Sequence, residues 1–274
     1  MHLASYKISS SKPLGLQCSS FHQATHILSK QSYLVKLYDL QYERELFLTE
    51  STILTKLSSC KYIISMHSNE IVQGYGIIVF DWFPFDLQTL LENKKLTEQQ
   101  RVNIFRLLCK AVKECHKNGL VHLNIRPESI LVSGDYSTIK LCDFEFTQPA
   151  VGKAALTTSN HSTLIYSAPE LFNPEPFHGN KADIWSLGML FHVLVTGYWP
   201  YEITEDDNEV LLRIKNGLFS NRIYDPSSLI LMNKMTAKNP AKRIDIFSLC
   251  LYTHKLYSHL PDCLILLACQ LCKK

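Results

Sequence analysis

The segment HLNIRPESILVSGDYSTIKLCDFEF, residues 122–146, concentrates polar residues of the kinds that orient hydroxyl groups and hold charged ligands. It reads as a catalytic loop that leads into a strand with a metal-binding carboxylate. Asn124 and Ser129 stand in the loop, and Asp143 follows the strand. A carboxylate can hold a metal ion, but an amide such as that of Asn124 cannot accept a proton from a hydroxyl group. The segment therefore offers a metal-binding carboxylate at Asp143 and lacks a proton acceptor at Asn124.

The part of the chain before this segment favours short strands and one helix. β-branched and aromatic residues cluster at Tyr33–Tyr38 and at Gly76–Phe80, which predicts two strands. Between them, apolar residues recur at three-to-four spacing from about Tyr42 to Leu57, which predicts a helix. A small, mostly-β lobe over residues 6–83 is the simplest interpretation.

The rest of the chain has a helical pattern. Thr97 and Gln100 have the spacing of a capping box, and Gly119 is placed to end the same helix. The segment Asp183–Gly197 is apolar on nearly every side, which predicts a helix surrounded by protein. We therefore expect an α+β, two-lobed fold with a helical lobe over residues 84–260 and an apolar extension over residues 261–274.

Composition limits the classes of function. The chain has 274 residues, 46% of them hydrophobic and 19% charged, and a net charge of +3 without a basic stripe, so nucleic-acid binding is not expected. No apolar run reaches the roughly 18 to 20 residues that span a bilayer, and no signal peptide is recognisable, so we expect a cytoplasmic protein. Nine cysteines, an odd number, favour reduced thiols. Cys269 and Cys272 form a lone CxxC, which fits a helix face better than a zinc site.

Several ordered motifs carry a resemblance to the eukaryotic protein kinases. HLNIRPESILV resembles their catalytic loop, and DFE at Asp143–Glu145 resembles DFG. Three further matches are APE at Ala168–Glu170, DIWSLG at Asp183–Gly188 and NPAKR at Asn239–Arg243. The resemblance covers about Tyr6 to Leu260 and implies a bilobal kinase fold, with ATP and magnesium as possible cofactors.

The resemblance assigns roles to individual residues. Lys36 matches the lysine that contacts nucleotide phosphates, Glu50 matches the helix glutamate that pairs with it, and Asp143 matches a metal ligand. Without the family register, Lys36 and Glu50 would be read as an ordinary solvated pair. Five other residues match nucleotide-binding positions: Gly15, Leu34, Asp81, Phe83 and Leu131.

The sequence departs from the family at four positions that would carry the reaction. Asn124 replaces the catalytic aspartate, Arg126 stands where a lysine is usual, and Ser129 is a weak substitute for the asparagine that holds a second metal. Glu145 replaces the DFG glycine and adds a carboxylate near the expected phosphates.

The glycine-rich loop and the strand positions that would face adenine are altered as well. Of the glycine-rich pattern only Gly15 remains, and glycines there let backbone N–H groups approach phosphate closely. Leu34 stands where a small alanine usually faces adenine, and Phe21 or His22 occupies the position of a valine in the preceding strand. Either bulky residue could fill the same space. The sequence leaves ATP binding open.

Other matches concern the scaffold. The resemblance implies that Glu170 and Arg243 form an ion pair and that Asp183 holds the catalytic-loop backbone. Leu123 replaces the arginine that receives an activation-loop phosphate, so that control is expected to be lost. STLIYSAPE resembles the substrate-docking segment of serine/threonine kinases, and LVTGYWPYE adds a likeness to their calmodulin-dependent and AMP-activated branch. The apolar tail is expected to form a short helix on the large lobe, with partner docking or acylation of its cysteines as alternatives.

The combined substitutions favour a pseudokinase that acts as a scaffold or conformational regulator of a protein partner. The alternative is an active, atypical serine/threonine protein kinase that transfers the γ-phosphate of ATP with Lys36, Asp143 and a single metal ion.

Overall fold

The computed structural model describes residues 5–9, 21–93, 96–150, 161–173, 176–201, 206–217 and 225–258. Their packing divides the chain into two compact units. The first comprises the described parts of 1–95 together with Pro127–Thr147, and the second comprises those of 96–126 and 148–274. The sequence predicted a single boundary between residues 83 and 84. The division by packing instead extends the first unit to residue 95 and adds residues 127–147 to it.

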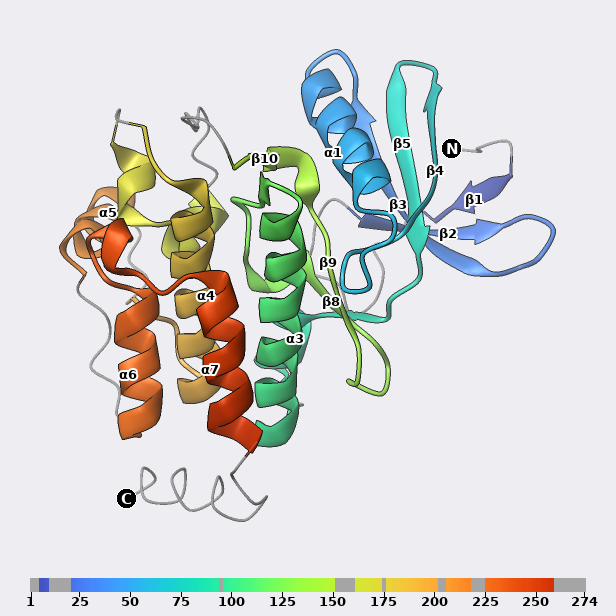
Figure 1. The fold of residues 1–274 in the computed structure, drawn as a ribbon. Helices are drawn as coiled ribbons and strands as arrows, with labels where there is room; N and C mark the ends of the chain where they lie inside the picture. The colour runs from blue at the N-terminus through green and yellow to red at the C-terminus, as the bar shows by residue number, and fades with distance from the viewer. Residues whose placement is uncertain are drawn as a thin grey trace. The chain divides into compact units, whose positions relative to one another are not determined.

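The first unit contains a five-stranded antiparallel sheet in the order β1-β2-β3-β5-β4 (Figure 1). The strands are β1 (Tyr6–Ile8), β2 (Phe21–His26), β3 (Ser32–Asp39), β4 (Met66–Val72) and β5 (Tyr75–Asp81). The predicted strands over 33–38 and 76–80 are thereby confirmed. Side chains alternate between the two faces of a strand. One face carries the apolar cluster of Ala24, Val35, Ile77 and Val79, so Leu34, Lys36 and Tyr38 belong to the other face.

The helix α1 (Arg44–Lys56) packs against β3, β4 and β5 of this sheet. It lies within the helix predicted from residue 42 to residue 57 and is slightly shorter. The approach to β5 is close at Gly76, where an added Cβ would lie 2.6 Å from Cγ of Phe47. A larger residue than glycine there would push α1 away from the sheet.

A second, three-stranded sheet in the first unit has the order β6-β8-β9. Its strands are β6 (Phe85–Asp86), β8 (Ile130–Val132) and β9 (Ile139–Leu141). The helix α2 (Leu87–Glu92) and two short helices, η1 (Pro127–Ser129) and η2 (Phe144–Phe146), flank it. The end of β9 is fixed to the segment after α1, since the amide of Ile64 donates to the carbonyl of Leu141 at 3.0 Å and Leu141 donates to Tyr62 at 2.9 Å. These bonds bring Asp143 close to α1.

The second unit is helical. Its helices are α3 (Glu98–Lys117), α4 (Gly179–Thr196), α5 (Asp207–Asn216), α6 (Pro226–Met235) and α7 (Ile246–Ser258), with η3 (His161–Tyr166), η4 (Pro169–Phe172) and η5 (Pro240–Lys242). The strands β7 (Leu120–Val121) and β10 (Gln148–Pro149) pair beside them. The capping box of Thr97 and Gln100 is present at the start of α3. Gly119 adopts a left-handed φ of 71° one residue beyond the helix cap, as its role at the helix end requires.

The helix α4 is the centre of the second unit, in contact with α3 and α6 (Figure 1). It is buried without interruption from Ala182 to Leu194, as the sequence predicts. An added Cβ on Gly188 would lie 2.6 Å from Cγ2 of Thr236, so glycine allows α4 to approach the end of α6. No helix among the described residues is both long and apolar enough to cross a membrane.

Candidate functional site

Lys36 is the centre of a buried cluster of charged side chains in the first unit. Its side chain is 2% exposed. Its Nζ lies 3.0 Å from Oε2 of Glu50, 3.0 Å from Oδ1 of Asp143 and 2.8 Å from Oε2 of Glu145. The predicted pairing of Lys36 with Glu50 is present, and it is a buried pair instead of a solvated one. The contact between Lys36 and Glu145 was not anticipated.

Backbone geometry brings the three carboxylates together. Glu50 lies on the buried face of α1. Asp143 adopts a left-handed φ of 65°, uncommon for a residue other than glycine, and this turns the chain into η2 directly after β9. The amide of Phe144 then donates to Oε1 of Glu50 at 2.9 Å. Glu50 therefore accepts from the backbone of η2 through one oxygen and contacts Lys36 through the other.

Tyr38 is part of the same cluster and was missed by the sequence interpretation. It follows Lys36 by two residues in β3, so both side chains point to the same face. Its hydroxyl donates to Oε2 of Glu50 and lies 3.4 Å from Oε2 of Glu145. A hydroxyl has a single hydrogen, and the shorter contact with Glu50 takes it. The two-residue spacing from the family lysine is the signal that could have identified Tyr38.

The buried charges alter one another's protonation. Burial alone would lower the pKa of Lys36, but the carboxylates of Asp143 and Glu50 outweigh it and raise the pKa well above its ordinary value. Burial, followed by the charge of Glu50, raises the pKa of Tyr38. Burial also raises the pKa of Glu145, against the attraction of Lys36. These shifts favour the ammonium form of Lys36 and the protonated hydroxyl of Tyr38.

Large apolar side chains fill the sheet face next to Lys36. In β3, Leu34 lies opposite Phe80, and Phe21 in β2 lies opposite Lys36. All three apolar side chains are 0% exposed, and the rings of Phe21 and Phe80 meet edge to face at 5.6 Å between centroids. His22 is opposite Val35 and belongs to the other face. The sequence allowed either Phe21 or His22 at the position of the family's valine. The strand register shows that Phe21 is the one on the face of Lys36.

The other predicted nucleotide-binding residues differ in their environment. Leu131 in β8 is fully buried, and Phe83 is 9% exposed. Asp81 is partly exposed and lies 2.8 Å from Nε2 of His67. Ser129 is buried, and its carbonyl accepts from the amide of Cys142 at 2.9 Å. Gly15 lies outside the described residues.

The arrangement around Lys36 does not fit a nucleotide phosphate as it stands. An ammonium group has three hydrogens, and three carboxylate oxygens lie within 3.0 Å of the Lys36 nitrogen. A phosphate would have to displace one of them. Within the described ranges, no group of three or more histidine, cysteine, aspartate or glutamate residues is arranged to hold a metal. Asp143 and Ser129 as metal ligands stay predictions.

The catalytic-loop residues belong to the second unit, where Asp183 fixes the backbone. Its Oδ2 accepts from the amide of His122 at 2.9 Å, and its Oδ1 accepts from the amide of Leu123 at 2.8 Å. Nε2 of His116 lies 2.8 Å from the same Oδ2. These bonds hold Leu123 at a left-handed φ of 63°. The predicted role of Asp183 in holding this loop is confirmed.

Asn124 and Arg126 follow directly on this fixed backbone. Asn124 is 3% exposed, and its amide N–H donates to Nδ1 of His122 at 3.2 Å. Arg126 is half-buried. Both residues are in the second unit, whereas Lys36 and Asp143 are in the first.

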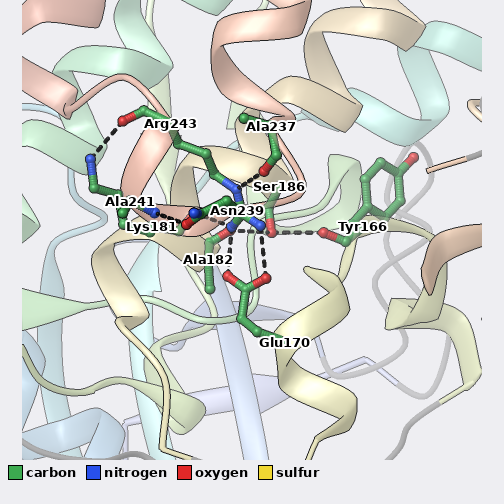
Figure 2. A network of polar contacts seen from close by, with 9 residues as sticks. All are labelled: Tyr166, Glu170, Lys181, Ala182, Ser186, Ala237, Asn239, Ala241 and Arg243. Atoms are coloured by element: carbon green, nitrogen blue, oxygen red, sulfur yellow. Dashed lines mark hydrogen bonds and ion pairs between the residues drawn. The ribbon is translucent and has the colours of Figure 1, made fainter. Parts of the chain in front are cut away.

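The predicted ion pair of Glu170 with Arg243 is also present (Figure 2). Arg243 donates from Nη1 to Oε1 at 2.5 Å and from Nη2 to Oε2 at 2.8 Å. Two further N–H groups donate to the carbonyls of Ala237 at 2.8 Å and Lys181 at 2.9 Å. Its guanidinium also stacks 4.9 Å from the ring centroid of Trp185. A bidentate pair with this many additional bonds is strong and directional.

Comparison with known proteins agrees with the motifs. The family model of the protein kinase domain matches residues 17–255. The carbon catabolite-derepressing protein kinase of Secale cereale is 34% identical over 164 residues, which cover 58% of this chain and 32% of the relative. Maternal embryonic leucine zipper kinase of Danio rerio is 30% identical over 161 residues, or 57% of this chain and 23% of the relative.

A third relative is a probable serine/threonine-protein kinase of Dictyostelium discoideum, 32% identical over 158 residues, which cover 57% of this chain and 19% of the relative. The chain therefore aligns with less than a third of the length of each of these relatives. The sequence is similar to serine/threonine kinases of the calmodulin-dependent and AMP-activated branch, and the fold is a strand-rich unit with a helical unit. With most of its length covered by one family model, the chain belongs to the protein kinase domain family.

Proposed function

We propose that this domain is a pseudokinase that regulates a protein partner through its conformation. The observation that supports this most directly is the catalytic loop of the second unit. Asp183 holds the loop backbone by two hydrogen bonds, so the loop has a fixed conformation. The residue carried on it at the base position is Asn124, whose amide accepts no proton from a substrate hydroxyl.

The substitutions at Asn124, Ser129 and Glu145 affect different parts of the same reaction. General-base catalysis contributes about 10²- to 10⁴-fold, and this contribution is missing with Asn124. Ser129 offers a metal only a weak, short oxygen ligand. Glu145 places a negative charge beside Lys36, the residue expected to neutralise phosphate. Each change alone would slow transfer, and together they favour a function that does not depend on turnover.

The scaffold contacts support a role in binding. The Glu170–Arg243 pair and the Asp183 bonds are complete, although they contribute nothing to proton or phosphoryl transfer themselves. A domain that keeps these contacts keeps the shape of its helical unit and can present it to a partner. A protein is the partner class that this family contacts, and the cytoplasm is the compartment that we propose for the encounter.

The second candidate is an active serine/threonine protein kinase. Two observations favour it: Lys36 lies 3.0 Å from both Glu50 and Asp143, and the relatives described above are named as kinases. ATP with a divalent metal would supply the transferred phosphoryl group. Because phosphoryl transfer depends chiefly on positioning and charge neutralisation, Asn124 could orient a hydroxyl in a slow reaction.

A phosphotransfer assay separates the two candidates. Purified protein is incubated with radiolabelled ATP and either Mg²⁺ or Mn²⁺, alone and with a mixture of serine- and threonine-containing peptides, and Lys36→Ala is the control. We expect no incorporation above the control. Incorporation by the wild type that disappears in Lys36→Ala would overturn the pseudokinase proposal.

Restoring the usual residues provides a second test. We expect Asn124→Asp combined with Ser129→Asn and Glu145→Gly to remain inactive, because Leu34, Phe21 and Phe80 still fill the sheet face beside Lys36. Adding Leu34→Ala to the triple variant is expected to produce measurable phosphotransfer. Activity in the triple variant without Leu34→Ala would show that the apolar cluster is no obstacle to nucleotide.

A further inference from the structure

We propose that Glu145 is an internal ligand of Lys36 that takes the place of a nucleotide phosphate, so that the Lys36–Glu50 pair is held together with no nucleotide bound. This inference rests on the proposed function and specifies how its nucleotide site is regulated. The glutamate that replaces the DFG glycine would therefore have a function of its own, which is to bind Lys36.

The first support is the number of partners around Lys36. Three carboxylate oxygens, one from each of three residues, lie at 2.8 to 3.0 Å from its nitrogen. An ammonium group offers three hydrogens and accepts nothing. Lys36 donates a hydrogen bond to Asp143 and forms ion pairs with Glu50 and Glu145, so a phosphate oxygen would compete with three carboxylate oxygens for the ammonium group.

The second support is the difference in exposure among the three carboxylates. The side chains of Glu50 and Asp143 are 0% and 2% exposed, whereas that of Glu145 is 18% exposed. Lys36 itself is only 2% exposed. Glu145 is therefore the partner through which solvent, or a ligand arriving from solvent, would reach the ammonium.

The third support is the way in which Glu145 is positioned. Asp143 turns the chain by its left-handed backbone, and the amide of Phe144 is bonded to Glu50 at 2.9 Å. The next side chain, Glu145, then points to the face of β3 that carries Lys36 and Tyr38. The Tyr38 hydroxyl lies 3.4 Å from the carboxylate that contacts Lys36. Lys36 thus holds Glu145 by an ion pair, and the Tyr38 hydroxyl, whose hydrogen goes to Glu50, lies beside the same carboxylate.

The charges determine what this arrangement excludes. One ammonium faces three carboxyl groups, so the cluster already supplies more negative than positive charge. A polyphosphate that reached Lys36 beside Glu145 would be repelled at short range in a poorly solvated place. Removing the Glu145 carboxylate would both free a hydrogen of Lys36 and remove that repulsion.

Two readouts on the full chain test the inference. The first measures the rate at which acetic anhydride acetylates Lys36, followed by peptide mass spectrometry. We expect Glu145→Ala and Glu145→Gln to label Lys36 at least about fivefold faster than the wild type, because the group that covers the amine is gone or uncharged. The matched control is Glu45→Ala, which removes an exposed carboxylate of α1 in the same unit and is expected to leave the rate unchanged.

The second readout is binding of ATP with Mg²⁺, measured by calorimetry in a background with Leu34→Ala, which makes room on the sheet face. Leu34→Val serves instead if Leu34→Ala melts below the assay temperature. We expect Glu145→Ala to tighten binding in this background by about tenfold, and Lys36→Ala to abolish the gain.

Either of two results overturns the inference: Lys36 labelling at the wild-type rate in Glu145→Ala, or equal ATP affinity with and without Glu145 in the Leu34 background. Neither result requires turnover. Failure of this inference is therefore distinguishable from failure of the proposed function, which depends on the phosphotransfer assay with the wild type.

Discussion

The two units contain buried cationic centres of opposite design. In the second unit, Arg243 faces a single carboxylate, that of Glu170, and donates two further hydrogen bonds to backbone carbonyls. In the first unit, Lys36 faces three carboxylates. The Arg243 centre balances one positive charge with one negative charge, as a structural ion pair requires. The Lys36 cluster has an excess of negative charge, as expected if a carboxylate of the chain occupies the place of a bound anion.

The contrast shows that two buried ion-pair centres in one chain can differ in their balance of charge. The pair around Arg243 and the bonds of Asp183 maintain the loop and the helices without reference to ATP. The cluster around Lys36 contains Glu145, one of the positions at which the sequence departs from the family in charge. Substitutions that affect the two centres differently can therefore test this interpretation.

The largest expected effect is the loss of the balanced pair. Arg243→Ala removes a buried cation and leaves Glu170 without its partner, which is expected to lower the free energy of unfolding by about 3–5 kcal/mol. Denaturant unfolding followed by circular dichroism measures it. The control is Arg213→Ala, which breaks the exposed pair with Glu209 in α5 and should cost less than about 0.5 kcal/mol. Similar losses in both variants would contradict a structural role for the Arg243 centre.

A smaller effect is expected from Tyr38→Phe. This change removes only the hydroxyl that donates to Glu50 and leaves a carboxylate oxygen less well satisfied in a buried cluster that already has excess negative charge. We expect the free energy of unfolding to fall by about 1–3 kcal/mol. Tyr33→Phe, on the opposite face of β3, is the matched control and should change little. An unaltered unfolding midpoint for Tyr38→Phe would contradict a stabilising role of the Tyr38 hydroxyl in the cluster.

The smallest effect is expected from Glu145→Gln, and it provides the sharpest comparison. Because Lys36 keeps two carboxylate partners, neutralising the third should change the free energy of unfolding by less than about 1 kcal/mol in either direction. The equivalent change in the balanced centre, Glu170→Gln, leaves Arg243 without any carboxylate and should cost about 3 kcal/mol or more. Equal losses of unfolding free energy in Glu145→Gln and Glu170→Gln would contradict the proposed difference in charge balance between the two centres.

Much of this arrangement could be predicted from the sequence because it depends on local pattern or on the family register. The helix expected over 42–57 is found over 44–56, and the capping box at Thr97 is present. The pair of Lys36 with Glu50 and that of Glu170 with Arg243 are present as well. Each follows from periodicity, from a short motif or from a residue matched to a known position.

The unpredicted features depend on how strands and turns orient side chains. Only the pairing register of β2 with β3 decides that Phe21, and not His22, shares a face with Lys36. The contact of Glu145 with Lys36 depends on the left-handed turn at Asp143. Sequence alone indicated that Glu145 would repel phosphate, and gave no reason to expect that its carboxylate would reach the same lysine.

The two bonds that Asp183 accepts from consecutive backbone amides have an evolutionary consequence. They fix the loop through its main chain, so its shape does not depend on the side chain at residue 124. Aspartate and asparagine codons differ by one nucleotide, and their side chains are nearly identical in size. A loop held in this way can exchange a proton acceptor for an amide, or regain one, in a single mutational step without refolding.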